Sequence, residues 1–313
     1  MPPSADSARR PTAAEAVVTL VAGPSTLAVA PAAGGAIACY RTEAAGGAID
    51  WLRPATPAAI AAGQSDAMGC FPLVPFSNRV RDGRFRFRGR AVAMPANVPG
   101  QAHVEHGHGW QRPWRVVAKE PRMLAIEYTH QADAWPFTYR ARQTFRLAED
   151  MLDVTIGARN LGDAPMPVGL GLHPYFPRTA TTRLTAAVQR MWATDHEVMP
   201  TALVDLPAER RLDDGVAVDR VAMDNAFTGW AGRATIEWPD SGAVLTMTAA
   251  APLSFLVVYT PPGEAYFCVE PVSNCTDAFN LAESGRDDTG MIVLAPGASL
   301  HTNVRFAIKI NRN

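Results

Sequence analysis

Residues 83–88 read Gly-Arg-Phe-Arg-Phe-Arg, an alternation of basic and aromatic side chains that indicates the fold class. Successive side chains of an extended strand point to opposite faces, so this period of two places both phenylalanines on one buried face. The pattern returns at residues 137–142, which read Phe-Thr-Tyr-Arg-Ala-Arg. Helical periodicity is weak, and only residues 57–64 and 203–212 are predicted to form short helices.

Many further short strands are predicted between turn signals rich in Gly, Pro, Asn and Asp. They cover residues 16–21, 27–30, 114–118, 124–129, 152–158, 235–238, 244–248, 255–259, 266–269 and 304–310. One turn signal, Asp82-Gly83, is of the kind that supplies positive φ in a tight hairpin. The chain is therefore predicted to be all-β, with large antiparallel sheets stacked as a sandwich or closed as a barrel.

No change in composition marks a second domain. We expect one β domain over residues 16–313, preceded by a disordered lead-in over residues 1–15 that is rich in Ala, Pro, Ser and Arg. Because 48% of the 313 residues are hydrophobic, the chain can bury a sizeable core.

The charge balance argues against a nucleic-acid partner. Lys and Arg total 29 against 30 Asp and Glu, a net charge of −1, whereas polyanion-binding proteins normally carry a basic excess. The local arginine clusters at 79–81 and 84–90 are predicted to be solvated strand faces. No apolar run is long enough for a membrane span, and the N-terminal stretch lacks the apolar core of a secretory signal. The four cysteines show no CxxC spacing, which favours a reducing compartment, and we expect the protein in the cytoplasm.

Three histidines lie close together in the segment His103-Val104-Glu105-His106-Gly107-His108. If this segment is a strand, His106 and His108 share a face and the cluster is a candidate metal site. The alternative, which we favour, is that one histidine is functional and that the neighbouring glycines let the backbone turn beside a small ligand.

Two other segments carry groups suited to proton transfer at neutral pH. His173 follows a Gly-x-Gly run and precedes Pro-Tyr-Phe, whereas Glu270 ends an apolar strand just before Pro271. Burial raises the pKa of a carboxyl toward the working pH, so Glu270 is a candidate general base; a core histidine and a surface glutamate are the plainer alternatives. Asp224 and Asp277 each stand near an aromatic residue, where an aspartate either binds hydroxyl groups or caps a turn.

Taken in order, these segments resemble the aldose 1-epimerase (mutarotase) family. The matching elements run over nearly the whole chain, from about Val18 to Ile308. They are Phe76-Ser77-Asn78-Arg79-Val80 with Gly83-x-Phe85-x-Phe87-x-Gly89, His106-Gly107 with Pro113-Trp114, Gly171-Leu172-His173-Pro174-Tyr175-Phe176, Asp224-x-x-Phe227 with Gly229, and Glu270-Pro271 followed by Asp277-Ala278-Phe279-Asn280.

The resemblance implies a large antiparallel β-sandwich, called a supersandwich, that interconverts the α and β anomers of free aldoses without a cofactor or metal. It implies that Glu270 is the general base for the C1 hydroxyl and that His173 is the general acid for the ring oxygen. The expected substrate-binding residues are Arg79, His106, Asp224, Asn78 and, as a stacking platform, Trp110. The expected partner is a monosaccharide, with neither nucleic acid nor membrane, and the protein is expected as a monomer or homodimer.

The sequence leaves several alternatives open. The Pro-Tyr-Phe-Pro-Arg run after His173 and the additional His108 depart from the better-known galactose mutarotases, so the preferred sugar stays open. A hexose-6-phosphate mutarotase shares the fold but needs extra basic residues near the site, for which Arg112 and Arg178 are candidates. A non-catalytic carbohydrate-binding sandwich and a metal-dependent β enzyme built on the three histidines are the remaining alternatives.

Overall fold

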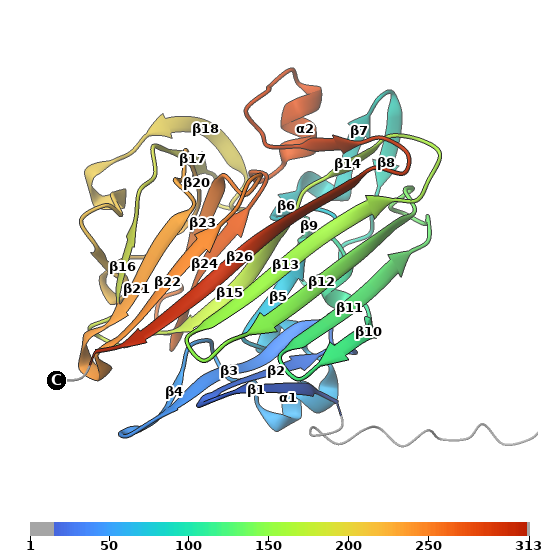
Figure 1. Cartoon of the computed structure of the whole chain (residues 1–313). Coiled ribbons are helices and arrows are strands. Elements are labelled where there is room, and N and C mark those ends of the chain that lie inside the picture. Colours follow the sequence, from blue (N-terminus) through green and yellow to red (C-terminus); the bar gives the residue numbers. More distant parts are fainter. Residues whose placement is uncertain (1–15, 312–313) are drawn as a thin grey trace, which may run out of the picture.

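The computed structural model describes residues 16–311, so the predicted lead-in over residues 1–15 lies outside the described residues. Two large antiparallel sheets are stacked on each other, which confirms the predicted all-β sandwich. Figure 1 looks onto the nine-stranded sheet, whose strands run from green (β10 to β13) through red (β26) to orange (β22 and β21), with the eleven-stranded sheet behind it.

The eleven-stranded sheet contains the first strands of the chain at one edge and strands from its second half at the other. Its order is β1 (Val18–Ala22), β2 (Ser25–Ala30), β3 (Ala36–Ala44), β5 (Cys70–Leu73), β15 (Gly171–Pro177), β24 (Tyr266–Val272), β23 (Phe255–Tyr259), β20 (Asp224–Thr228), β17 (Arg190–Thr194) and β18 (Pro200–Asp205), with β4 (Gly47–Asp50) paired to β3.

The nine-stranded sheet has the order β10 (Arg115–Glu120), β11 (Met123–His130), β12 (Tyr139–Leu147), β13 (Met151–Asn160), β26 (Ser299–Ile310), β22 (Ala243–Ala249), β21 (Arg233–Trp238), β16 (Arg183–Ala186) and β19 (Val216–Ala217). Three two-stranded ribbons pair β6 (Arg79–Val80) with β9 (Val104–Glu105), β7 (Arg84–Phe87) with β8 (Arg90–Ala93), and β14 (Met166–Val168) with β25 (Ile292–Leu294). The described helices are α1 (Pro57–Ala62), α2 (Ala278–Glu283) and six 3-10 turns: η1 (Ser65–Ala67), η2 (Arg81–Gly83), η3 (Gly109–Gln111), η4 (Ala208–Arg210), η5 (Val218–Arg220) and η6 (Pro239–Ser241).

The main hydrophobic core lies between the two sheets. Leu27 and Tyr40 reach it from the eleven-stranded sheet, and Phe145, Ile156 and Phe306 reach it from the nine-stranded sheet. All five side chains are fully buried. Burying such apolar area is the main favourable contribution to folding, at about 25 cal/mol per Å² removed from water.

The eleven-stranded sheet also buries side chains on its other face, where a second cluster forms. Along β24, Phe267 and Val269 point into the main core, whereas Cys268 belongs to the second cluster. Along β23, Val258 points into the main core and Val257 into the second cluster. These central strands are therefore buried on both faces, and every second residue is directed away from the inter-sheet core.

The strand predicted from the alternation at residues 83–88 is confirmed as β7, in which Phe85 and Phe87 are buried while Arg84 and Arg86 are exposed. The structure confirms the positive φ at Asp82 (52°) and Gly83 (64°). The hairpin expected there is wrong, because β6 pairs with β9 and β7 pairs with β8. The turn instead connects the β6–β9 ribbon to the β7–β8 ribbon.

The first predicted helix is confirmed as α1, which begins with Pro57 after the N-cap Thr56. The helix predicted over residues 203–212 is wrong. Residues up to Asp205 extend β18, which pairs with β17, and only the 3-10 turn η4 follows. Pro207 lies inside that segment, where it lacks a backbone donor and disfavours a continuous helix. Helix α2 was missed because six residues are too few to show a helical period.

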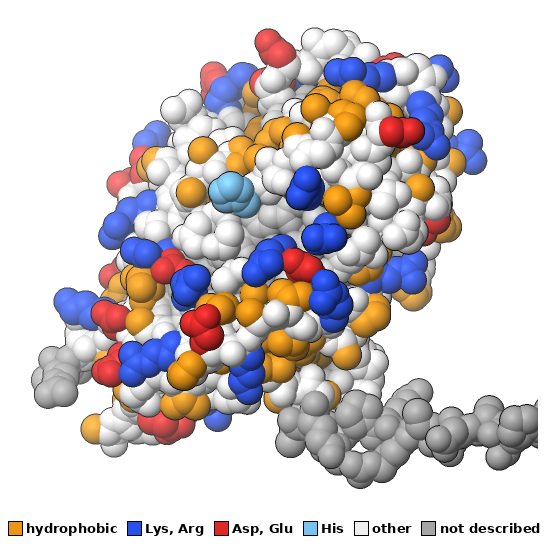
Figure 2. Space-filling model, turned by 45° about the vertical axis from the view of Figure 1, so that its right-hand side comes forward, with side chains coloured by type: hydrophobic (Ala, Val, Ile, Leu, Met, Phe, Trp, Pro, Cys, Tyr) orange, Lys and Arg blue, Asp and Glu red, His pale blue; other side chains and the backbone are white. Residues whose placement is uncertain are grey.

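Charged side chains of both signs are mixed on the side of the molecule shown in Figure 2, with hydrophobic side chains between them. Several of the arginines on the outer face of the nine-stranded sheet are paired, as in Arg305–Asp153 (2.8 Å) and Arg142–Glu127 (3.0 Å). Within residues 16–311, none of the helices has the length and apolar character needed to cross a bilayer.

Candidate active site

A cavity of about 280 Å³ opens on the eleven-stranded sheet, on the face turned away from the main core. All seven residues predicted from the sequence to catalyse or to bind substrate line it. The complete lining is Asp66, Phe71, Asn78, Arg79, Val98, Gln101, Glu105, His106, Trp110, His173, Tyr175, Asp224, Val257, Tyr259, Tyr266 and Glu270. The structure thus brings the predicted residues together, and their individual roles stay predictions.

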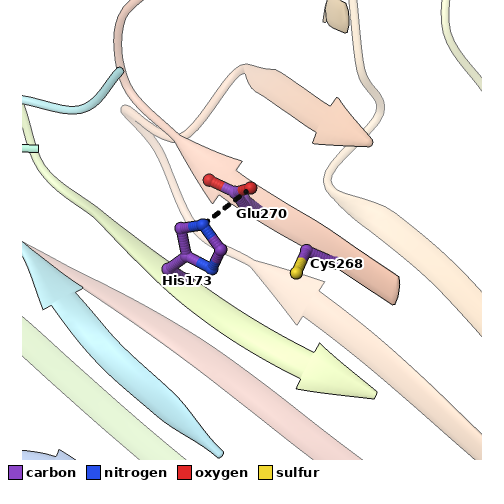
Figure 3. Close-up of side chains that lie close together, drawn as sticks. All are labelled: His173, Cys268 and Glu270. Atoms are coloured by element: carbon purple, nitrogen blue, oxygen red, sulfur yellow. Dashed lines mark ion pairs between the residues drawn. The ribbon is translucent and has the colours of Figure 1, made fainter. Parts of the chain in front are cut away.

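The register of two central strands brings His173 and Glu270 face to face. Strands β15 and β24 pair Gly171 with Val272 and Tyr175 with Cys268, so His173 lies opposite Glu270. The Nε2 atom of His173 and the Oε1 atom of Glu270 are 3.3 Å apart (Figure 3). Directly opposed side chains of an antiparallel pair are the closest neighbours that a sheet can supply.

Both members of this pair are buried, at 7% exposure for His173 and 2% for Glu270. Burial raises the pKa of Glu270 well above its ordinary value; Asp224 adds to the rise and Arg79 opposes it. Burial lowers the pKa of His173 well below its ordinary value, and His106 lowers it further. Since burial disfavours the charged form of each group, we infer that near neutral pH the pair holds one titratable proton between its two members.

Aromatic rings fix the orientation of His173. Phe71, its cross-strand partner on β5, stacks on the imidazole with ring centroids 4.5 Å apart. Tyr175, two residues along β15, stacks at 4.6 Å, and the guanidinium of Arg53 lies 3.8 Å from the Tyr175 ring centroid. These two aromatic neighbours pack on the imidazole and restrict its rotation away from the orientation that points Nε2 at Glu270.

His106 is held by Asn78 through two backbone contacts. The Asn78 N–H donates to Nδ1 of His106 at 3.1 Å, and the His106 N–H donates to the Asn78 carbonyl at 2.8 Å. Because Nδ1 accepts a hydrogen bond, the neutral ring carries its proton on Nε2. Burial lowers the pKa of His106 to about 4, although Glu105 opposes the shift. His106 is therefore a neutral hydrogen-bond donor rather than a cation.

The backbone around His106 is tightly constrained. Asn78 and His106 both have positive φ, at 62° and 60°, and Gly107 continues at 67°. A Cβ atom on Gly107 would lie 2.5 Å from the Val74 carbonyl oxygen and from the Pro75 ring, so only glycine fits there. Strained backbone of this kind is found where a structure holds functional groups in place.

Arg79 joins two carboxylates at the cavity wall. Its Nε donates to Glu105 Oε1 at 2.8 Å, across the short β6–β9 ribbon, and its Nη1 lies 3.8 Å from Asp224 Oδ2. Asp224 is itself the cross-strand partner of Tyr259. Burial raises the pKa of Asp224, and the Arg79 cation opposes that rise.

The three neighbouring histidines point to three different places. His106 lines the cavity, whereas His103 accepts a hydrogen bond from the Asp82 N–H at 3.1 Å and His108 lies 2.9 Å from the Tyr139 hydroxyl. The expectation that His106 and His108 share a strand face is wrong, because the positive φ at His106 and at the following glycine ends the extended conformation. These histidines do not form a common metal site.

Trp110 forms part of the wall but leaves little of its ring free. It is 7% exposed, stacks on Phe71 with centroids 5.1 Å apart, and donates its indole N–H to the Gly107 carbonyl at 3.2 Å. The candidate phosphate ligands lie elsewhere. Arg178 contacts the Asp219 carboxylate at 3.4 Å, and Arg112 lines a separate hollow.

The family model described as aldose 1-epimerase matches residues 16–307. This chain belongs to the aldose 1-epimerase family. The resemblance inferred from the sequence is thereby confirmed, and the match spans both sheets and every residue of the cavity lining.

Relatives of this aldose 1-epimerase family member include proteins of Escherichia coli K12. The uncharacterized protein YphB is 34% identical over 266 residues, which cover 82% of this chain and 88% of that protein. A crystal structure from the same organism, provisionally named as an aldose 1-epimerase, is similar with a TM-score of 0.85 at 30% identity, over 94% of this chain and 99% of that chain. A galactose mutarotase-like protein from Clostridium acetobutylicum shares the fold, with a TM-score of 0.84 at 18% identity, over 94% of this chain and 95% of that chain.

Sequence reasoning about this family member missed several residues of the wall. Glu105, Tyr259 and Tyr266 line the cavity, as do Asp66 and Gln101. Tyr259 could have been placed beside the cavity from the period of two, because the predicted strand over residues 255–259 puts it on the same face as Val257. Asp66, in the 3-10 turn η1, and Gln101, in a loop, follow no pattern that a single sequence reveals.

Proposed function

We propose that this protein interconverts the α and β anomers of a free aldose by general acid–base opening and closing of the sugar ring. The observation that carries the proposal is the buried His173–Glu270 pair, with 3.3 Å between Nε2 and Oε1, at the floor of a sugar-sized cavity. A β-sandwich that only bound a sugar would gain nothing from a buried carboxyl beside a buried imidazole, because burying two titratable groups costs free energy.

The first half of the reaction opens the ring. In the competent form Glu270 is a carboxylate and His173 an imidazolium, so the single proton of the pair resides on His173. Glu270 takes the proton from the C1 hydroxyl, His173 gives its proton to the ring oxygen, and the bond between C1 and that oxygen breaks. The products are the open-chain aldehyde, a neutral Glu270 and a neutral His173. Each positioned proton transfer contributes roughly 10²–10⁴-fold to the rate.

The second half runs the same transfers in reverse after rotation about the C1–C2 bond. The hydroxyl formed from the ring oxygen attacks the other face of the aldehyde and returns its proton to His173. Glu270 gives its proton back to the carbonyl oxygen, which becomes the C1 hydroxyl of the other anomer. The number of protons on the pair is the same before and after, so no external acid or base is consumed.

The remaining cavity residues supply hydrogen bonds that orient the sugar. His106 presents a neutral N–H to an oxygen, and Arg79 presents donors that also offset negative charge on Glu270. Asp224 accepts from hydroxyl groups, while Tyr266 offers aromatic surface for the C–H face of the sugar. Fixing the substrate in this way converts binding contacts into correct alignment of the two proton transfers.

The charges in the cavity favour an uncharged sugar. Within the described residues, the lining carries the carboxylates of Asp66, Glu105 and Asp224 against the one guanidinium of Arg79, since the His173–Glu270 pair with its single proton is neutral overall. A phosphate dianion entering this cavity would meet like charges with little compensation. We therefore propose a free aldose rather than a hexose 6-phosphate as the substrate.

Polarimetry of freshly dissolved sugars tests the proposal. We expect the protein to accelerate the mutarotation of at least one of α-glucose, α-galactose and an arabinose. For glucose 6-phosphate we expect a kcat/KM at least about tenfold lower than for glucose, from charge repulsion. Failure to accelerate any of the four would overturn the enzymatic proposal, and preference for the phosphate ester would overturn the choice of a free sugar.

The pH dependence of kcat/KM should respond to the charge at position 79. The pKa of Glu270 is raised by burial and by Asp224, and the Arg79 cation opposes this. Arg79→Gln removes the opposing charge, so the His173–Glu270 pair keeps its single proton to higher pH, and the alkaline limb of the profile, where that proton is lost, moves up. Loss of sugar contacts should raise KM as well, and stopped-flow polarimetry over a pH series measures both effects.

Arg79→Lys is the matched control because it retains the positive charge. Its KM should rise through the loss of the paired guanidinium donors, whereas its alkaline limb should stay close to that of the unsubstituted protein. If the alkaline limb did not move in Arg79→Gln, loss of the proton from the His173–Glu270 pair would not be what governs it.

A further inference from the structure

A thiol lies beside the proposed catalytic pair and has no part in the mechanism above. Cys268 stands two residues before Glu270 on β24, on the same face of the strand (Figure 3). It is the cross-strand partner of Tyr175. It is a free cysteine and is fully buried. The ligating atoms of His173, Cys268 and Glu270 all lie within 4.8 Å of one another.

Two polar atoms in this group have unused hydrogen-bonding capacity. Within the described residues, Nδ1 of His173 and Oε2 of Glu270 are buried and have no hydrogen-bond partner. Buried polar atoms without partners are rare in proteins and favour any ligand that satisfies them. Both residues also line the cavity, so a ligand from solvent can reach them.

The three ligand types match a borderline-soft divalent cation. Zinc is bound by imidazole nitrogen, thiolate sulfur and carboxylate oxygen, and open zinc sites have three protein ligands with a fourth position free. Zinc–ligand bonds of about 2.0–2.3 Å at tetrahedral angles place ligand atoms about 3.5 Å apart. The separations of up to 4.8 Å between the ligand atoms therefore need only small side-chain adjustments to reach this value, and the His173–Glu270 separation of 3.3 Å already fits.

We propose that His173, Cys268 and Glu270 form a binding site for Zn²⁺ or a cation of its class, and that occupation of this site inhibits the enzyme reversibly. A thiolate and a carboxylate together balance the charge of a divalent cation, so the occupied site is neutral within a buried environment. Inhibition follows because a cation bound to Glu270 removes the base from proton transfer, whichever ring nitrogen His173 contributes. The inhibition, unlike the binding itself, rests on the proposed function.

Direct binding is measured first, on the metal-free full-length protein. Titration with Co²⁺ should give one equivalent of a species with a thiolate-to-cobalt absorption band, and Zn²⁺ should displace it. Cys268→Ala should abolish the band and weaken Zn²⁺ binding by about 100-fold or more, measured by calorimetry. Cys39→Ala is the matched control, since Cys39 is the more accessible thiol and lies on β3; its variant should bind like the unsubstituted protein.

Mutarotation is then followed with added Zn²⁺. The rate should fall with the Zn²⁺ dependence found by calorimetry, should return on addition of EDTA, and should be far less sensitive in Cys268→Ala. The absence of Cys268-dependent binding would overturn the site, and binding without loss of activity would overturn the inhibition. A protein that binds Co²⁺ through Cys268 but accelerates no sugar would leave the metal site standing and would count against the proposed function alone.

Discussion

Replacing Glu270 by glutamine is expected to lower kcat for mutarotation by about 10³-fold or more, in line with the loss of a positioned general base. Glutamine has nearly the same shape but cannot take the proton from the C1 hydroxyl. Folding should survive. Glu270 is 2% exposed and its Oε2 atom has no hydrogen-bond partner within the described residues, so glutamine breaks no hydrogen bond at that atom and removes a group whose charged form burial disfavours.

Polarimetry gives the rate, and thermal unfolding followed by circular dichroism gives the stability. The midpoint of unfolding should be unchanged or higher in Glu270→Gln. The matched control is Glu237→Gln, the same substitution at a half-buried position on β21 of the other sheet, for which kcat should stay within about twofold. If Glu270→Gln turned over sugar at the unsubstituted rate, the base would have to be another residue.

The sheet architecture was within reach of the sequence because its signal is local. The alternation around Phe85 and Phe87 reports one buried face, and a period of two is visible within six residues. The order in which the strands pair could not be predicted, since no local pattern shows that β15 lies between β5 and β24. That order decides the site, because it sets His173 between Phe71 on one side and Glu270 on the other.

The site residues likewise divide into those that a local pattern identifies and those whose position depends on distant segments. His173 and Glu270 stand in segments that resemble a family, so they were identifiable as candidates, although their separation was not. The metal alternative built on neighbouring histidines failed because it assumed that sequence neighbours share a strand face. Positive φ at His106 and Gly107 sends His108 away from the cavity, toward the hydroxyl of Tyr139. Backbone turns of this kind depend on contacts from distant segments and are hard to read from one sequence.

The expectation for His173→Gln tests whether the two groups work as one unit. Its kcat should also fall by roughly 10²–10⁴-fold through the loss of the acid. It should be less stable than Glu270→Gln by about 1–2 kcal/mol, since the imidazole stacks on both Phe71 and Tyr175. Chemical denaturation measures this difference.

The decisive comparison is the double variant Glu270→Gln/His173→Gln. Independent contributions would multiply, giving a loss of roughly 10⁵-fold or more. In the proposed mechanism one proton passes through both groups, so removing either one already blocks the route that needs the other. We therefore expect the kcat of the double variant to lie within about tenfold of the slower single variant, as for catalytic residues that act as a unit.

His103→Gln supplies the control for this cycle. His103 is also a buried histidine but contacts Asp82 and does not line the cavity, so its substitution should leave kcat unchanged and combine multiplicatively with Glu270→Gln. Multiplicative losses in the His173 cycle would mean that the imidazole and the carboxylate act in separate steps. The proposal of a shared proton would then be wrong, even if both residues proved essential for catalysis. A buried acid and base whose atoms lie 3.3 Å apart are expected to depend on each other only if one proton passes between them through the substrate.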